Sequence, residues 1–211
     1  MNNVTFITAL VLVSGMAAGA NADVMMSTQE VSNTLSGYRT WDILATVDND
    51  WTQAQMIIDL SQGNFYNHND GGNTTPNPTL IGYVPELAFD TFVTAPGSYP
   101  NTASGDTPSI AGEAANLGSS SSGAQFTDTL VDVAWFDTIN DGAGQFVVAR
   151  VTVSDSASGT MQIGGYQLGD STMTSFPSTI ENGVVTVTPE PTTMGLIGLG
   201  AMALLRRRRS A

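Results

Sequence analysis

Apolar and polar residues alternate in short runs along most of the chain, a two-residue period typical of β-strands with one buried face. Trp41, Ile43, Ala45 and Val47 share one side of such a run, and the residues between them lie on the other side. None of these runs shows a sustained 3.6-residue period, and Gly, Asn, Ser and Pro separate them. The middle of the chain is therefore predicted to be all-β, an antiparallel β-sandwich or jelly roll. The expected strands are 41–47, 55–60, 80–84, 87–93, 130–136, 146–153, 161–168 and 184–187.

Two further features of the pattern concern strand faces and loops. Alternation within 146–153 predicts that Phe146 shares a face with Arg150, opposite Ala149 and Val151. The polar segments 61–79 and 94–125 are expected to be loops. Loops longer than about 15 residues are usually functional or disordered.

The N-terminus has the pattern of an export signal. Its first 22 residues contain no charged side chain, and Phe6–Val13 is an apolar run with one Thr. Ala20-Asn21-Ala22 supplies the small residues that signal peptidase requires, so residues 1–22 are predicted to be a signal peptide cut after Ala22. The run is too short to span a bilayer, which takes about 20 residues. A buried N-terminal strand or helix is the alternative.

The C-terminus has three consecutive parts. The motif Pro189, Glu190 and Pro191 comes first, an uncharged apolar segment at 192–205 follows, and a basic cluster completes it: Arg206, Arg207, Arg208 and Arg209. Clustered Arg after an apolar stretch predicts a stop-transfer segment with its Arg in the cytoplasm. As a helix, 192–205 would be about 21 Å long, against a hydrocarbon core of about 30 Å, which predicts a transient anchor. A core helix with a solvated basic tip is the alternative.

The order of these three parts resembles the PEP-CTERM protein-sorting signal of bacterial envelope proteins. The resemblance covers 189–211 and implies that an exosortase, a membrane protease, recognises Pro189, Glu190 and Pro191 and processes the tail near them. It further implies that Arg206–Arg209 form the cytoplasmic stop and that the destination is the cell surface or an exopolysaccharide matrix. Because two prolines keep a backbone extended, the motif suits a protease cleft. The family assigns no activity to residues 23–188, the expected cargo domain, which resembles no family that we recognise.

The charge of the cargo domain excludes several function classes. Of the 19 acidic residues all but Glu190 lie in 23–188, whereas only Arg39 and Arg150 supply positive charge there, which gives a net charge near −16. A nucleic-acid-binding protein needs a basic surface, so nucleic acid is not an expected partner. The chain has no Cys, which excludes disulfides, zinc–cysteine sites and cysteine nucleophiles.

Candidate metal and catalytic residues are few. The single His, His68, has no nucleophile or carboxylate at a motif spacing, which favours a solvated loop residue and excludes a multi-His metal site. Asp48-Asn49-Asp50 and the run 137–142 are oxygen-rich turns, and extracellular calcium prefers such ligands. Neither has the EF-hand spacing, and Asp and Asn favour turns without an ion. No cofactor is expected, and calcium is the alternative.

Aromatic residues offer a route to sugar binding by stacking. Trp41 and Trp135 lie on apolar strand faces and are expected in the core, whereas Trp51, Tyr66 and Tyr83 are candidates for an exposed platform, Trp51 and Tyr66 above all. The sequence therefore predicts an exported, exosortase-sorted protein with a non-enzymatic structural role. An exopolysaccharide-binding module is the alternative, and a hydrolase with two carboxylates about 5–10 Å apart is the third reading.

Overall fold

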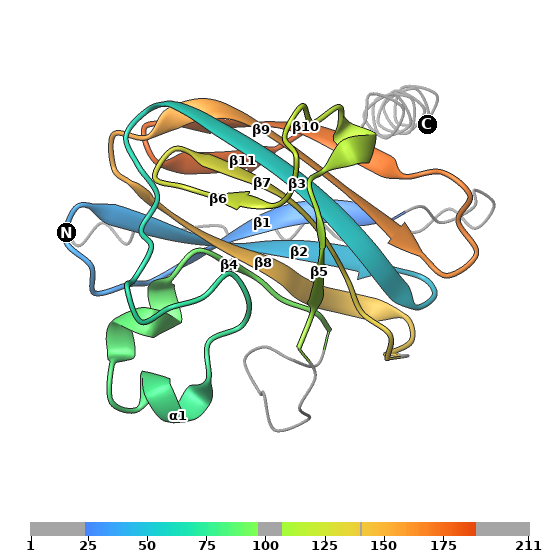
Figure 1. Ribbon diagram of the computed structural model, residues 1–211, viewed down its shortest axis with the longest axis horizontal. Coiled ribbons are helices and arrows are strands. Elements are labelled where there is room, and N and C mark those ends of the chain that lie inside the picture. The colour runs from blue at the N-terminus through green and yellow to red at the C-terminus, as the bar shows by residue number, and fades with distance from the viewer. Residues whose placement is uncertain (1–23, 97–106, 140, 189–211) are drawn as a thin grey trace, which may run out of the picture.

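The computed structural model describes residues 24–96, 107–139 and 141–188, and all the strand pairs within them are antiparallel. Two sheets face each other as the layers of a sandwich (Figure 1), which confirms the predicted fold class. The four-stranded sheet has the order β1 (Met25–Val31), β2 (Tyr38–Val47), β8 (Gly144–Ser154), β4 (Phe92–Val93). The seven-stranded sheet has the order β11 (Val184–Val187), β10 (Thr174–Glu181), β9 (Ser158–Gln167), β3 (Trp51–Gln62), β7 (Leu130–Phe136), β5 (Ser109–Gly112), with β6 (Gln125–Phe126) also paired to β7.

The core lies between the two sheets because every long strand turns its apolar face inward. Its largest fully buried side chains come from both layers and from one loop: Trp51, Trp135, Phe65, Ile43, Met56, Ile58, Ile163 and Ile180. Leu87 and Phe92 are also fully buried but lie outside this core cluster. Burying a side chain of this size stabilises the fold by about 1.5–3 kcal/mol. The predicted core positions Trp41 and Trp135 are confirmed, at 8% and 0% exposure.

A bulge in β8 reverses the predicted faces of one strand. Opposite β2, Ile43 pairs with Ala149 but Leu44 pairs with Val147, so Val148 is an extra residue. One extra residue turns the rest of the strand over. Phe146 therefore packs against the core on the same side as Ala149, and the prediction that it shares a face with Arg150 is wrong.

Short helices and turns stand in place of two predicted strands. The predicted strand 80–84 begins inside α1 (Pro78–Ile81), which starts with Pro78 and is capped by Asn77, whose side chain accepts a 2.8 Å hydrogen bond from the Thr79 amide. Pro in the first turn and an Asn cap favour a helix start. The predicted strand 87–93 begins inside η1 (Pro85–Phe89), and only its last two residues, β4, form a strand. The strands β1 and β10 are not among those predicted from the sequence, and the expected loop 94–125 is wrong where β5 lies and where β6 begins.

Described loop segments on the outer face of each sheet are held there by buried polar side chains. The loop that carries α1 and η1 covers the four-stranded sheet (Figure 1). There Arg150 forms a buried ion pair with Asp42 over 2.7 Å and donates to the Ala88 carbonyl over 2.5 Å. On the other sheet, Asp132 accepts a hydrogen bond from the Ala114 amide over 2.8 Å and one from the Ser119 hydroxyl. The second loop carries η3 (Ala115–Leu117).

The predicted targeting segments lie outside the described residues. These are the signal peptide 1–22 with Ala20 and Ala22, the motif Pro189–Pro191, and the apolar and Arg segments 192–209. Among residues 24–96, 107–139 and 141–188, the structure has no helix long and apolar enough to cross a membrane.

Candidate functional site

The folded domain ends immediately before the Pro-Glu-Pro motif. The edge strand β11 ends at Val187, and the Thr188 amide still donates a 3.2 Å hydrogen bond to the Pro177 carbonyl of β10. Pro189 is the next residue. No linker therefore separates the sandwich from the motif.

The β10–β11 hairpin is anchored firmly at its turn. Asn182 and Gly183 have positive φ values of 50° and 73°, the conformation that a two-residue Asn-Gly hairpin turn requires. A Cβ at Gly183 would lie 3.1 Å from the Asp155 Cα, so a larger residue would be crowded there as well. The indole N–H of Trp41 donates to the Gly183 carbonyl over 2.9 Å, and the Gly183 amide donates to Ala157 over 2.9 Å. These bonds join the turn to the four-stranded sheet and to the β8–β9 turn.

The opposite end of the hairpin is held more weakly, for a reason that lies in one residue of β10. Pro177 has no amide hydrogen, so it accepts from Thr188 and cannot donate in return. Proline is tolerated in a sheet only where its missing amide removes no hydrogen bond between strands, or where the pairing of the two strands ends. Pro177 is visible in the sequence, but its effect on the pairing is not, because 174–181 is not among the strands predicted from the sequence.

His68 belongs to a loop that a buried carboxylate organises. Asp90, 2% exposed, accepts hydrogen bonds from the His68 amide over 2.9 Å and from the Thr91 amide over 3.0 Å. Burial raises the pKa of the Asp90 carboxyl to about 6, and the two amides offset part of this effect. The imidazole Nδ1 of His68 accepts from the Asp70 amide over 3.1 Å. Asp90 therefore fixes the loop backbone, and His68 is half-buried in that loop.

The two acidic turns meet at one end of the sandwich. Asp50 accepts from the amides of Asp141 and Gly142 over 2.8 and 3.2 Å, and Gln167 accepts from the Asp48 and Asn49 amides. Within the parts of the chain that the structure describes, no group of three or more His, Asp or Glu side chains is arranged to hold a metal ion. The side-chain oxygens of Asp50 and Gln167 thus accept hydrogen bonds from backbone amides.

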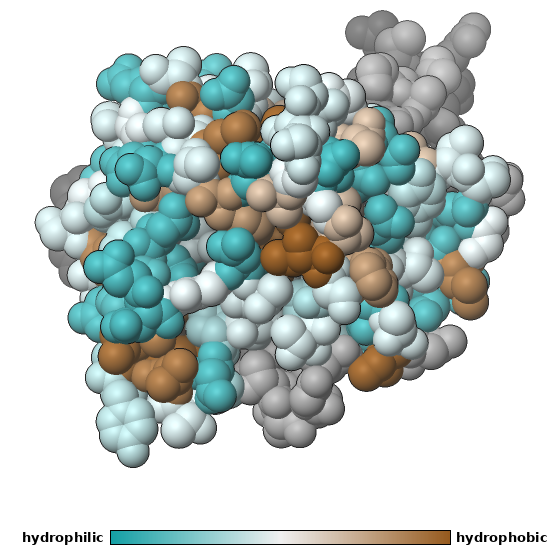
Figure 2. Space-filling view, in the orientation of Figure 1, coloured by the Kyte–Doolittle hydropathy of each residue, from teal (hydrophilic) through white to brown (hydrophobic). Residues whose placement is uncertain are grey.

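The predicted aromatic platform is not assembled as expected. Trp51 is fully buried, so its predicted exposure is wrong: β3 begins at this residue and directs the ring inward. Tyr66 is half-buried and meets Tyr38 edge-on, with ring centroids 5.4 Å apart. Tyr83, by contrast, is 82% exposed beside α1, where Leu80 is also exposed. Figure 2 shows apolar side chains gathered on this lower part of the molecule.

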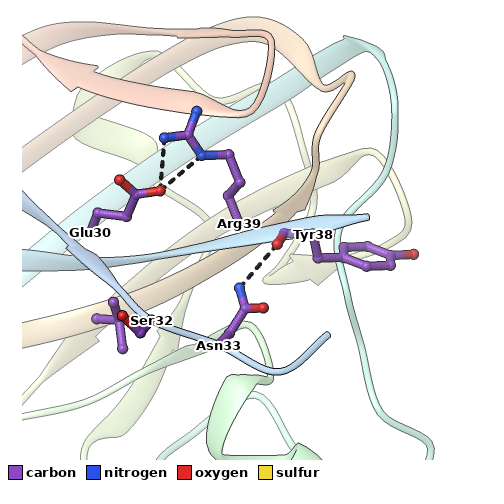
Figure 3. Close-up of a pocket in the computed structure, with 6 residues that line it drawn as sticks. Glu30, Ser32, Asn33, Tyr38 and Arg39 are labelled. Atoms are coloured by element: carbon purple, nitrogen blue, oxygen red, sulfur yellow. Dashed lines mark hydrogen bonds and ion pairs between the residues drawn. The ribbon is translucent and has the colours of Figure 1, made fainter. Parts of the chain in front are cut away.

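A shallow hollow of about 430 Å³ lies where β1 turns into β2 (Figure 3). The Nε and Nη2 atoms of Arg39 donate to Glu30 over 2.9 and 2.7 Å. The Arg39 guanidinium also lies over the Trp41 ring, 5.3 Å from its centroid. The Asn33 amide, which points toward β2 in Figure 3, donates to the Tyr38 carbonyl. The polar groups of the hollow thus hold the hairpin itself together.

Comparison with known proteins bears on the end of the chain. No curated protein and no solved structure matches the chain significantly. Residues 187–209 match the family model of the PEP-CTERM protein-sorting motif. The match begins inside β11, at Val187. The chain therefore carries a PEP-CTERM sorting signal, which marks it as an exported protein that exosortase sorts to the cell envelope or surface.

Proposed function

We propose that residues 23–188 are a non-enzymatic structural component of the bacterial cell surface or extracellular matrix. The observation that carries the proposal is the position of the sorting signal, which follows a closed sandwich with no intervening linker. Such an arrangement delivers the sandwich itself to the surface. Signal peptidase would remove 1–22 after Ala22, and exosortase would process the tail while 192–205 holds it transiently in the membrane.

The polar groups of the sandwich support a structural role. The buried ion pair of Asp42 and Arg150 holds one long loop against its sheet, and Asp132 holds the other. Asp90 fixes the backbone around His68. These buried groups are engaged in maintaining the fold. The net charge near −16 keeps neighbouring copies soluble and apart, and we expect the domain to need no cofactor.

Fractionation of the native host tests this proposal. Cells that produce the full chain should carry the mature domain in the surface or matrix fraction, and deletion of 189–211 should move it to the soluble periplasmic or culture fraction. A matched control with Ser210 and Ala211 alone deleted keeps the three-part signal and should fractionate like the wild type. Equal fractionation of the 189–211 deletion and the wild type would contradict the proposal.

A second candidate function is the binding of exopolysaccharide, and one observation favours it. Tyr83 presents its ring to solvent at 82% exposure, next to Leu80 at 47%. Exposed aromatic rings stack on sugar faces, and stacking uses the apolar body of the ring. Under this hypothesis, Tyr83→Ala weakens co-sedimentation with the host polysaccharide and Tyr83→Phe retains it. Equal co-sedimentation of both variants and the wild type would reject a role for this ring.

A further inference from the structure

The end of β11 belongs both to the folded sheet and to the sorting signal, and both uses cannot be satisfied at once. We propose that residues 186–188 unpair from β10 before the tail is processed, while the β10–β11 turn stays anchored. The inference rests on the proposed processing by exosortase. It adds a step that precedes any cleavage, the local opening of one edge strand.

The edge strand and the sorting signal overlap at the end of β11. The match to the sorting-signal family model spans 187–209, and the first matched residue, Val187, pairs with Ser178 in the sheet. Thr188 is bonded to Pro177 in the same ladder. A protease binds its substrate as an extended segment and forms main-chain hydrogen bonds to it, as peptide-binding proteins do when they add a strand. The residues just before Pro189 cannot offer their backbone to β10 and to a protease together.

The two ends of the β10–β11 hairpin are anchored unevenly. Trp41 and Ala157 hold Gly183 at the turn, and Val185, 2% exposed, fills a position in the core. At the other end, Thr186 is exposed and Val187 is only half-buried against the core, so their release uncovers less apolar surface than release of Val185 would. Opening therefore starts at Thr188 and stops at Val185.

Pro177 weakens the last pair of the hairpin. It and Thr188 share one hydrogen bond, whereas such a pair usually forms two. Its side chain is exposed, so replacing it disturbs no packing. Edge strands with incomplete ladders open locally without global unfolding. When such opening is fast, the population of the open form sets the rate of proteolysis.

A disulfide staple tests the proposal, because the chain has no Cys of its own. Thr179 and Thr186 are exposed partners in β10 and β11. Full-length precursor with Thr179→Cys and Thr186→Cys is incubated with host membranes that contain the processing enzyme, with and without reductant. The matched control carries Thr160→Cys and Thr179→Cys, which staple β9 to β10 and leave β11 free. Loss of the tail is followed by mass spectrometry.

The oxidised β10–β11 staple should be processed at least about ten-fold more slowly than the reduced form, because the staple removes the open population. The oxidised and reduced forms of the control variant should be processed at the same rate. Pro177→Thr restores an amide opposite Thr188 and should slow processing about two- to ten-fold, the effect of one hydrogen bond. Equal rates for the oxidised and reduced β10–β11 staple would overturn the inference.

Hydrogen exchange on the purified full-length chain in detergent gives a readout that needs no exosortase. The Thr188 amide should exchange faster than the Gly183 amide, which is bonded to Ala157 at the anchored end, and Pro177→Thr should slow its exchange. If both amides exchange only by global unfolding, the opening proposed here does not occur. If Thr188 opens locally but host membranes never process the wild type, the proposed sorting fails, and with it the role of this opening.

Discussion

The indole N–H of Trp41 in β2 donates a 2.9 Å hydrogen bond to the carbonyl of Gly183, which lies in a turn of the opposite sheet. This bond joins the two layers next to the strand that leads into the sorting motif. Trp41→Phe keeps most of the ring but leaves a buried carbonyl without its donor. We expect a loss of about 1–3 kcal/mol in the free energy of unfolding, measured by urea denaturation. Tyr83→Phe is the control and should change stability by less than about 0.5 kcal/mol; similar values for both variants would contradict the bridging role.

Both the positive φ of Gly183 and the limited space around its Cα favour glycine at this position. Gly183→Ala adds a methyl group 3.1 Å from the Asp155 Cα at a φ of 73°. Gly118→Ala is the matched control, because Gly118 has a φ of 84° with nothing within 4 Å. Backbone strain alone costs about 1–2 kcal/mol, so Gly118→Ala should show that loss in thermal or urea unfolding and Gly183→Ala a larger one. Equal losses would mean that the turn yields to the added methyl.

The buried ion pair should be far more sensitive to the loss of one partner than the exposed pair. Arg150→Met leaves Asp42 charged and buried, and breaking a buried pair in this way typically destabilises a protein by about 3–5 kcal/mol. Arg39→Met breaks the exposed pair with Glu30 and should change stability by about 0–1 kcal/mol. Combining Arg150→Met with Asp42→Leu should recover most of the loss. A double variant no more stable than Arg150→Met would show that the pair is not the cause.

The raised pKa of Asp90 predicts a specific pH dependence. In the folded protein the pKa is about 6, against 3.8 as the ordinary value, so the native state binds the Asp90 proton more tightly than the unfolded chain does. This contribution to stability is present below pH 3.8 and is lost as the pH rises to about 6 and beyond. Asp90→Asn keeps an acceptor for the His68 and Thr91 amides but does not titrate. Its stability relative to the wild type should therefore rise by about 1–3 kcal/mol between pH 4 and pH 7. A difference that is constant across this range would contradict the assignment.

The sequence predicted the fold class well because the alternation in β2, β7 and β8 is strong and the turn residues are frequent. It failed where tertiary contacts decide. Nothing local reveals the bulge at Val148, which exists only opposite β2, or the inward direction of Trp51. Residues 80–84 are apolar enough for a strand, but the cap at Asn77 starts a helix before them.

Part of the candidate site could be predicted from the sequence, and part of it could not. The sorting signal can be identified from the sequence alone because its three parts, the motif Pro189–Pro191, the apolar segment and the Arg cluster, follow one another along the chain. The incomplete pairing of Pro177 with Thr188 and the pKa of Asp90 depend on residues that are distant in sequence, and only the folded chain brings them together.

Mass spectrometry of the protein recovered from the surface fraction of its own host tests the central claim, export and sorting of a compact acidic sandwich, most directly. The account predicts a mature chain that begins at Asp23 and lacks the cluster Arg206–Arg209. An intact C-terminal Arg cluster in the surface-located protein would contradict it.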